Sequence, residues 1–328
     1  MHKTSNDMYK FEPILKSTLW GGEKIIPYKG IESAQTAVGE SWELSGVKGN
    51  ESVVAAGPDA GRTLPELIAR DGAALMGRAN AERFGGEFPL LIKFIDARQD
   101  LSIQVHPDDR LAWERHRSKG KTEMWYVVDA DPGAKLRAGF AQAVTPEEYE
   151  ASVADNTITD LLAEYEIHRG DLFFLPAGRV HSIGAGAFIA EIQQTSDITY
   201  RIYDFNRRDA QGKTRELHTE LAKGAIDYTV LPDYRTPYRK APNERVELVA
   251  CPYFTTSLLD LTAPYTLDLS ALDSFVVAIC TEGRGTLRDD RGNEMPLHRG
   301  ETVLIPASVG SVAIAPEEGM KVLTSWIA

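Results

Sequence analysis

The sequence predicts a mainly β chain built from two related β-units, the first of which carries helical inserts. Along most of the chain, short runs rich in β-branched and aromatic residues are separated by Gly and Pro, which is typical of strands and turns. In addition, HRGDLFFLPAGRVHSIG (168–184) aligns without a gap with HRGETVLIPASVGSVAI (298–314), 130 residues further on. Ser311 stands in the second copy where the first has His181, so the second unit keeps the scaffold and lacks the histidine.

The composition argues for a globular protein and against a nucleic-acid-binding, membrane-bound or disulfide-rich one. The 328 residues, 43% of them hydrophobic, are enough for one large domain or two ordinary ones with a sizeable core. A net charge of −12 argues against nucleic acid or an anionic membrane as partner, and leaves room for a local basic pocket that binds one phosphorylated small molecule. Two cysteines, Cys251 and Cys280, form neither a disulfide framework nor a metal-type pair. The start lacks an apolar signal core and no apolar run approaches membrane-spanning length, so we expect a cytoplasmic protein.

The first half of the chain alternates strands with helical inserts. We expect short strands and turns over residues 9–60, and a helix over 62–85 that begins at a capping box formed by Thr63 and Glu66. Strands are then expected at 88–97 and 101–106, a short helix at 108–118, a strand at 123–130 and a helix over 145–165. Residues 167–204 return to strands, the Pro-rich segment 230–247 reads as a linker, and 248–328 are strands and turns.

Polar residues on one face of the strand LSIQVH indicate a metal site. Residues two apart on a strand point the same way, so Gln104 and His106 can reach the same ion. Glu123 opens the next strand, and His181 ends the turn PAGRVH. If these strands line one barrel, an amide, two imidazoles and a carboxylate converge, which are donors that zinc and related metals accept.

The spacing in GDLFFLPAGRVH matches the second motif of cupins, in which Gly and Pro shape a turn that presents a histidine inside a small β-barrel. With the internal repeat, this match predicts two cupin barrels of the jelly-roll type. We divide the chain into a catalytic cupin domain with helical inserts (1–238) and a degenerate C-terminal cupin domain (239–328).

The chain resembles the type I mannose-6-phosphate isomerases, in their shorter bacterial form. The motifs that carry the resemblance run in order from about residue 11 to the end: TLWGG…GESWELS, SIQVHP, KTEMWYV, PAGRVHSIGAG and AEIQQTSDITYRIYDF. The usual histidine pair of cupins reads Gln-Val-His here, as it does in this family, and Ala185 replaces an asparagine that often closes the second motif. The chain has no room for the large helical domain of the longer eukaryotic enzymes.

The resemblance implies a role for ten residues. It implies that one zinc ion per chain is bound by Gln104, His106, Glu123 and His181. It implies catalytic roles for Arg201, Lys121 and Glu191, and substrate contacts for Ser102, Lys93 and Asp197, with Ser102 and Lys93 on the wall associated with the phosphate. His116 and His218 lie among charged residues and are interpreted as solvated, and Trp20 and Trp42 as packing residues.

The reaction implied by the resemblance interconverts mannose 6-phosphate and fructose 6-phosphate through a cis-enediol, in a monomer or homodimer. The base stays open between Glu191 and a metal-bound water. Two alternatives remain: a non-catalytic sugar-binding or regulatory cupin, and another metal-dependent cupin enzyme such as an oxygenase. The presence of Arg201 and Lys121 disfavours the first, and the Gln ligand disfavours the second, which usually has a His-rich iron site.

Overall fold

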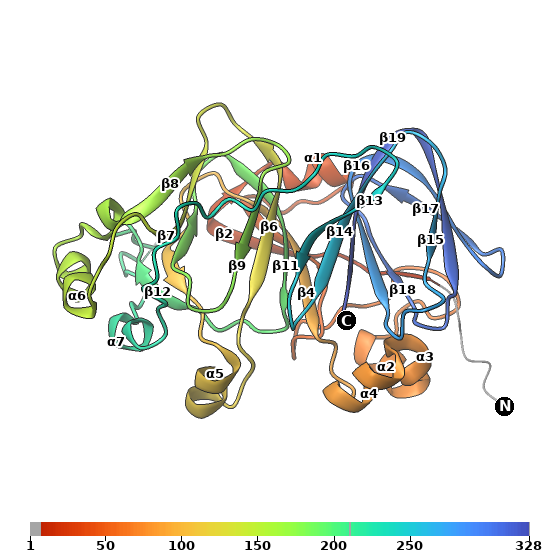
Figure 1. The fold of residues 1–328 in the computed structure, drawn as a ribbon, viewed down its shortest axis with the longest axis horizontal. Coiled ribbons are helices and arrows are strands. Elements are labelled where there is room, and N and C mark those ends of the chain that lie inside the picture. The colour runs from red at the N-terminus through yellow and green to blue at the C-terminus, as the bar shows by residue number, and fades with distance from the viewer. Residues whose placement is uncertain (1–7, 210, 328) are drawn as a thin grey trace.

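A computed structural model describes residues 8–209 and 211–327. Two β-barrels lie side by side, the N-terminal one coloured mainly red to green and the C-terminal one mainly teal to blue (Figure 1). The predicted mainly β architecture with helical inserts is confirmed.

The N-terminal barrel consists of two facing sheets. One has six strands in the order β2 (Ile14–Gly22), β3 (Val38–Leu44), β4 (Leu90–Asp96), β11 (Ala187–Gln194), β6 (Glu123–Ala130) and β9 (Leu172–Leu175). The other has five strands in the order β12 (Tyr200–Tyr203), β5 (Ile103–Val105), β10 (His181–Ile183), β7 (Lys135–Phe140) and β8 (Leu162–Glu166).

The C-terminal barrel is formed by a sheet of eight strands. Six follow one path: β1 (Tyr9–Lys10), β18 (Thr302–Ile305), β16 (Val276–Asp289), β19 (Ser311–Trp326), β14 (Thr255–Leu261) and β13 (Arg245–Ala250). Two more pair outside this path, β15 (Tyr265–Asp268) with β19 and β17 (Glu294–His298) with β16. Strand β1 comes from the start of the chain, where Tyr9 pairs with Leu304.

The helices lie outside the barrels (Figure 1). They are α1 (Ile25–Lys29), α2 (Leu64–Asp71), α3 (Ala73–Met76), α4 (Arg78–Phe84), α5 (Asp109–His116), α6 (Pro146–Ala154), α7 (Thr219–Lys223) and the 3₁₀ helix η1 (Ile158–Leu161). Helices α6 and α7 cover the outer face of the five-stranded sheet through buried side chains such as Tyr149 and Ala222, which pack with Val105 and Ile202.

Two predicted helices are shorter than expected. The helix expected over 62–85 begins at the Thr63–Glu66 capping box as predicted, but it breaks into α2, α3 and α4 at Gly72 and Gly77. Gly77 has φ +87°, and a Cβ at this position would lie only 2.1 Å from Asp273 O in the C-terminal barrel, so the break falls at a position that favours glycine. The helix expected over 145–165 ends at Ala154, and the chain continues as η1 and β8.

The internal repeat is confirmed in three dimensions. Its two copies form β9 followed by β10 in the first barrel, and β18 followed by the start of β19 in the second. Gly170 and Gly300 occupy the same position of the repeat, and both take a left-handed φ, +88° and +84°, which glycine tolerates best.

The outer face of the six-stranded sheet packs against the C-terminal barrel. Phe94 and Ile192 from the first barrel and Val277 and Leu323 from the second belong to the same buried cluster. The segment predicted as a linker also packs on the first barrel, since the Tyr234 side chain is buried and its hydroxyl donates to Phe140 O at 3.1 Å. Among the described residues, no helix has the length and apolar character needed to cross a membrane.

Candidate active site

Three predicted site residues form one row across the five-stranded sheet. Gln104 on β5 pairs with His181 on β10 on one side and with Arg201 on β12 on the other. Directly opposed residues of antiparallel strands project from the same face of a sheet. The register therefore brings residues from three distant parts of the sequence to the barrel interior.

The facing sheet supplies the acidic residues and a lysine. Glu191 on β11 pairs with Lys93 on β4, and the next residue of β11 on the same face, Gln193, pairs with Glu123 on β6. Since β-strand side chains alternate between faces, Glu123 and Glu191 project from the same face.

A tight turn presents His181. Gly178 takes φ +91°, and a Cβ there would lie 3.0 Å from Ala225 O, so the position favours glycine on both counts. The Gly178 amide donates to His106 O at 2.9 Å, and the Ala177 amide donates to the Thr122 hydroxyl at 3.2 Å. The turn is thus tied to the strand ends that carry His106 and Glu123.

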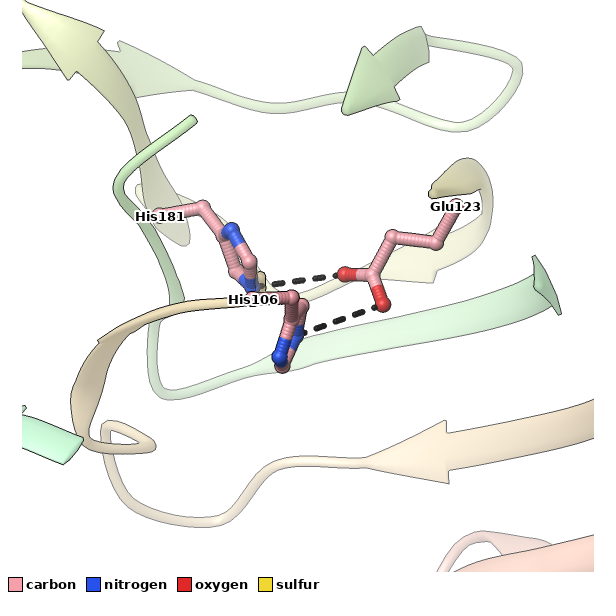
Figure 2. Close-up of side chains that lie close together, drawn as sticks. All are labelled: His106, Glu123 and His181. Carbon is pink, nitrogen blue, oxygen red and sulfur yellow. Dashed lines mark ion pairs between the residues drawn. The ribbon is translucent and has the colours of Figure 1, made fainter. Parts of the chain in front are cut away.

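His106, Glu123 and His181 converge on one point (Figure 2). His106 Nε2 lies 3.5 Å from Glu123 Oε2, and His181 Nε2 lies 3.3 Å from Glu123 Oε1. All three side chains are buried, and their potential ligand atoms lie within 4.8 Å of one another. In residues 8–209 and 211–327, no other group of three or more His, Cys, Asp and Glu side chains is arranged in this way.

The backbone orients both imidazoles. His106 Nδ1 lies 2.9 Å from Ile198 O, and His181 Nδ1 lies 2.8 Å from Arg179 O. Because a carbonyl oxygen can only accept, each Nδ1 carries the proton and each Nε2 offers its lone pair to the centre of the group. Burial lowers the pKa of both rings, to about 4 for His181, which keeps them neutral and able to bind a metal.

Glu123 is a buried carboxylate whose one close cationic neighbour is Lys121, 3.1 Å away, among the described residues. Neither of its oxygens accepts a hydrogen bond of good geometry among the described residues. Burial and the nearby Glu191 carboxylate raise the pKa of Glu123 to about 7, although Lys121 opposes the shift. A buried anion of this kind is stabilised by a cation.

Gln104 completes the group with an amide. Its Nε2 lies 3.3 Å from His181 Nε2, and its Oε1 lies 3.4 Å from the Ser102 hydroxyl. A half-turn of the amide would direct Oε1 toward the same centre. Two imidazoles, one carboxylate and one amide oxygen suit zinc and related divalent metals, so the residues fit the metal that the sequence predicts.

Lys121 lies beside the group, on the loop that leads into β6. Its Nζ is 3.1 Å from Glu123 Oε2 and 3.2 Å from His106 Nε2. Asp109 Oδ1 holds this loop by accepting from the Gly120 amide at 2.8 Å and from Gln194 Nε2 at 3.0 Å. Lys121 also lines the adjacent pocket.

A pocket of about 180 Å³ opens next to this group. The predicted residues that line it are Lys93, Ser102, Gln104, Lys121, Glu191, Asp197 and Arg201. The structure therefore places every predicted catalytic and substrate residue around one cavity, with His106, Glu123 and His181 buried beside it. Trp20 and Trp42, interpreted from the sequence as packing residues, also line the cavity, as do Glu40 and Arg215.

Lys93 and Glu191 form a buried ion pair in the pocket wall. Lys93 Nζ lies 3.3 Å from Glu191 Oε2 and 3.7 Å from Glu40 Oε2. Burial favours neutral groups, but the mutual attraction of these charges outweighs it, raising the pKa of Lys93 and lowering that of Glu191. Trp125 Nε1 also donates to Glu191 Oε1 at 2.9 Å, so Glu191 is a carboxylate at neutral pH.

Arg201 enters the pocket from β12 with an unused donor. Its Nη1 donates to Glu216 O at 3.2 Å, while its Nε is buried without a hydrogen-bond partner among the described residues. Arg215 lies nearby and its Nε donates to Asp204 at 2.7 Å. Asp197 is exposed at the same cavity, whereas Ser102 is buried.

Two residues near Arg201, which the sequence did not predict to belong to the site, are Arg215 and His218. Arg215 lines the pocket, and His218, which the sequence suggested to be solvated, accepts a hydrogen bond from the Arg201 amide. Both lie in the short segment TRELH (214–218). Its mixture of charged residues offers no periodic signal, so only the fold reveals its position. His116 is exposed, in agreement with the solvated interpretation, and its Nε2 also lies 2.8 Å from the Tyr200 hydroxyl.

The fold and the site define a class: proteins with two jelly-roll barrels in which the first barrel holds a candidate metal centre beside a charged pocket, and the second copy of the repeat lacks the histidine. Comparison with known proteins narrows the class to a family. The profile of the type I phosphomannose isomerase catalytic domain matches residues 8–146, and that of the mannose-6-phosphate isomerase cupin domain matches residues 244–322.

Relatives cover nearly the whole chain. The chain is 33% identical to mannose-6-phosphate isomerase ManA of Bacillus subtilis, over 92% of this chain and 93% of the relative. It is 34% identical to a mannose-6-phosphate isomerase of Streptococcus mutans, over 89% and 90%. The crystal structure of the mannose 6-phosphate isomerase from Bacillus subtilis superimposes with a TM-score of 0.85 at 29% identity, covering 97% of this chain and 99% of that one.

This chain belongs to the type I mannose-6-phosphate isomerase family and is an isomerase. The predicted family and the predicted two-cupin fold are thereby confirmed.

Proposed function

We propose that this isomerase interconverts mannose 6-phosphate and fructose 6-phosphate through a cis-enediol, with one zinc ion held by Gln104, His106, Glu123 and His181. The observation that carries the proposal is the convergence of His106, Glu123 and His181 beside the pocket that Arg201, Lys121 and Glu191 line. The names of the relatives in Bacillus subtilis and Streptococcus mutans support the choice of substrate.

The charges of the site support a substrate with a phosphate group. Four cationic side chains line the pocket, and four carboxylates surround the same space: Lys93, Lys121, Arg201 and Arg215 against Glu40, Glu191, Asp197 and the adjacent Glu123. One further carboxylate, Asp204, is bound to Arg215. A bound divalent cation would add two positive charges to those of the cationic side chains, which favours a dianionic phosphate monoester as substrate.

The metal, when bound, supplies Lewis-acid polarisation of the substrate's carbonyl and hydroxyl oxygens. Glu123 is the one charged ligand of the proposed four, so the protein neutralises only one of the metal's two positive charges. His106 and His181 are held for this role by their Nδ1 contacts with Ile198 O and Arg179 O.

The remaining residues handle the sugar and its proton. The reaction removes the proton from C2 of the aldose and returns a proton to C1, so the formula of the sugar does not change. Glu191, ionised and in the pocket, is able to accept that proton. Arg201 stabilises the negative charge that develops on the oxygens, Lys121 orients hydroxyl groups, and Ser102, Lys93 and Asp197 bind the rest of the substrate.

A non-catalytic sugar-binding cupin would need neither Arg201 nor Lys121 beside the metal ligands, and both line this pocket. An oxygenase would hold iron rather than zinc and would take up oxygen. Metal analysis of the purified protein separates these candidates, because zinc together with isomerase turnover supports only the proposed function.

A coupled assay of mannose 6-phosphate turnover, with and without a chelator, tests the proposal. We expect turnover to be lost with the metal and restored by zinc, at a stoichiometry near one ion per chain.

His106→Ala and His181→Ala should each lower the metal content and abolish most turnover, because each removes one converging donor. His168→Ala, which changes an exposed histidine outside the site, is the matched control. Full zinc occupancy and a normal rate in either His106 or His181 variant would exclude this metal site.

A further inference from the structure

Strand β12 lies at the edge of its sheet, so one side of its backbone is not paired with another strand. Free backbone amides and carbonyls of an edge strand need partners from elsewhere. At Arg201 those partners come from the segment Glu216–His218. This segment follows in sequence but approaches from outside the sheet.

Three hydrogen bonds join Arg201 to this segment. His218 Nδ1 accepts from the Arg201 amide at 3.0 Å, and the His218 amide donates to Arg201 O at 2.7 Å. In addition, Arg201 Nη1 donates to Glu216 O at 3.2 Å. The main chain and the guanidinium of one residue are therefore held from the same side.

His218 is itself anchored. Its carbonyl accepts from the Ala222 amide at 2.8 Å at the start of α7. Helix α7 is tied to helices α5 and α6, because Arg115 Nη1 on α5 donates to Leu221 O at 2.9 Å and the Tyr149 hydroxyl on α6 donates to Thr219 O at 3.2 Å. The imidazole lies 6.3 Å from the Tyr200 ring, measured between centroids, and its side chain is 23% exposed.

We propose that His218 is a positioning residue for Arg201: its Nδ1 lone pair and backbone amide complete the free edge of β12 and fix the direction in which the guanidinium enters the pocket. The proposal rests on the proposed role of Arg201. Because Nδ1 accepts, the proton of the neutral ring is on Nε2. A displacement of about 1 Å in a group that orients or stabilises the reacting atoms can reduce the rate about a hundredfold, so an indirect contact of this kind can matter to turnover.

Three variants at His218 test the hydrogen bond rather than the bulk of the side chain. Asn places an amide oxygen near the position of Nδ1, Gln places it one bond further, and Leu offers no acceptor. We expect His218→Leu and His218→Gln to lower kcat by about ten- to a hundredfold with little change in KM, and His218→Asn to recover most of the rate. Metal content and thermal stability, measured on each variant, identify any loss that comes from misfolding.

A double-mutant cycle with Arg201→Ala separates this proposal from the proposed function. We expect His218→Leu to add no further loss in the Arg201→Ala background, since its effect passes through Arg201. Normal turnover in Arg201→Ala would overturn both the role of Arg201 and the positioning proposal. If Arg201→Ala loses turnover but the Gln and Leu variants at 218 keep it, or if the two losses multiply, the role of His218 is wrong while that of Arg201 stands.

Discussion

Glu123 shows at the scale of one residue why this site suits a cation. Its carboxylate is fully buried, and no hydrogen bond of good geometry satisfies either oxygen among the described residues. A buried charge without such bonds is expensive, and a neighbouring cation is the usual remedy. Lys121 is near enough to serve in part, and a divalent metal would serve better.

Metal affinity should therefore depend on pH through Glu123. In the protein without metal its pKa is raised to about 7, and the metal binds the carboxylate, so below about pH 7 binding must displace a proton. We expect zinc affinity, measured by competition with a chelator, to rise with pH up to about 7 and then to level off. His106 and His181 have lowered pKa values and are already neutral over this range.

The free energy of unfolding of the metal-free protein should instead fall as the pH rises, as far as Glu123 determines it. A carboxyl whose pKa is raised by folding contributes stability below its unfolded pKa of about 4.5, and this contribution is lost as the pH rises through about 7. Glu123→Gln should remove this loss and also flatten the pH dependence of zinc binding. An unchanged pH profile in Glu123→Gln would show that another group is responsible.

Arg201 should affect turnover and not the fold. Arg201→Ala removes a half-buried cation that forms no ion pair with a carboxylate in residues 8–209 and 211–327, so the variant should fold and keep its metal. Turnover should fall by about a hundredfold or more, the scale for loss of one electrostatic contact in the transition state. Arg201→Lys should recover little, because lysine lacks the planar fork. A folded, metal-replete Arg201→Ala enzyme with near-normal turnover would contradict the assigned role.

At the scale of elements, the sequence predicted which segments form strands and which residues share a face of a strand, but it did not predict which strands pair with one another. Alternation placed Gln104 and His106 on one face, and the repeat located the turn before His181, because both signals are local. The row that joins Arg201, Gln104 and His181 depends on the register of three strands from distant parts of the chain, which no local pattern encodes. The family resemblance, rather than periodicity, supplied Arg201.

The prediction of one long helix over 62–85 was wrong for a related reason. A continuous helical pattern over 62–85 gave no sign that Gly77 must bring the chain against Asp273, almost two hundred residues away. For the same reason His218 looked solvated, since the edge strand that it completes is set only by the fold.

Gly77 should be sensitive to substitution. At Gly77, φ is +87°, and an added Cβ would lie 2.1 Å from Asp273 O, a backbone atom that cannot move aside easily. Gly86, at φ +97° with no atom within 4 Å of the added Cβ, is the matched control for backbone strain alone. We expect Gly77→Ala to lower the free energy of unfolding by about 1–3 kcal/mol more than Gly86→Ala, as overpacking does, in denaturant titrations. Equal losses would show that the helices do not depend on this close approach.

For the whole molecule, the second barrel supports the first, and its described residues include no group of three or more His, Cys, Asp and Glu side chains close enough to hold a metal. Its β-sheet incorporates β1 from the start of the chain, and its apolar face covers the outer face of the six-stranded sheet that holds Glu123 and Glu191. The rings of Phe88 and Phe275 meet across this contact, 4.6 Å apart between centroids. The degenerate barrel thus buries the back of the sheet that carries the acidic half of the site.

The two barrels should consequently unfold together. The boundary between the catalytic cupin domain and the degenerate one, placed after residue 238, stays a prediction. Strand β1 precedes this boundary in sequence but belongs to the C-terminal sheet in the fold. Cutting the chain after residue 238 would expose the shared apolar cluster and remove a strand from the C-terminal sheet.

We expect the intact chain to show one calorimetric transition, with the calorimetric and van't Hoff enthalpies equal. A fragment of residues 1–238 should be insoluble or lack fixed tertiary packing in near-UV circular dichroism, because an apolar face of this extent would meet water. Two separate transitions, or a stable fragment that binds zinc and turns over substrate, would show instead that the N-terminal barrel is an independent domain and that the second barrel is dispensable for the site.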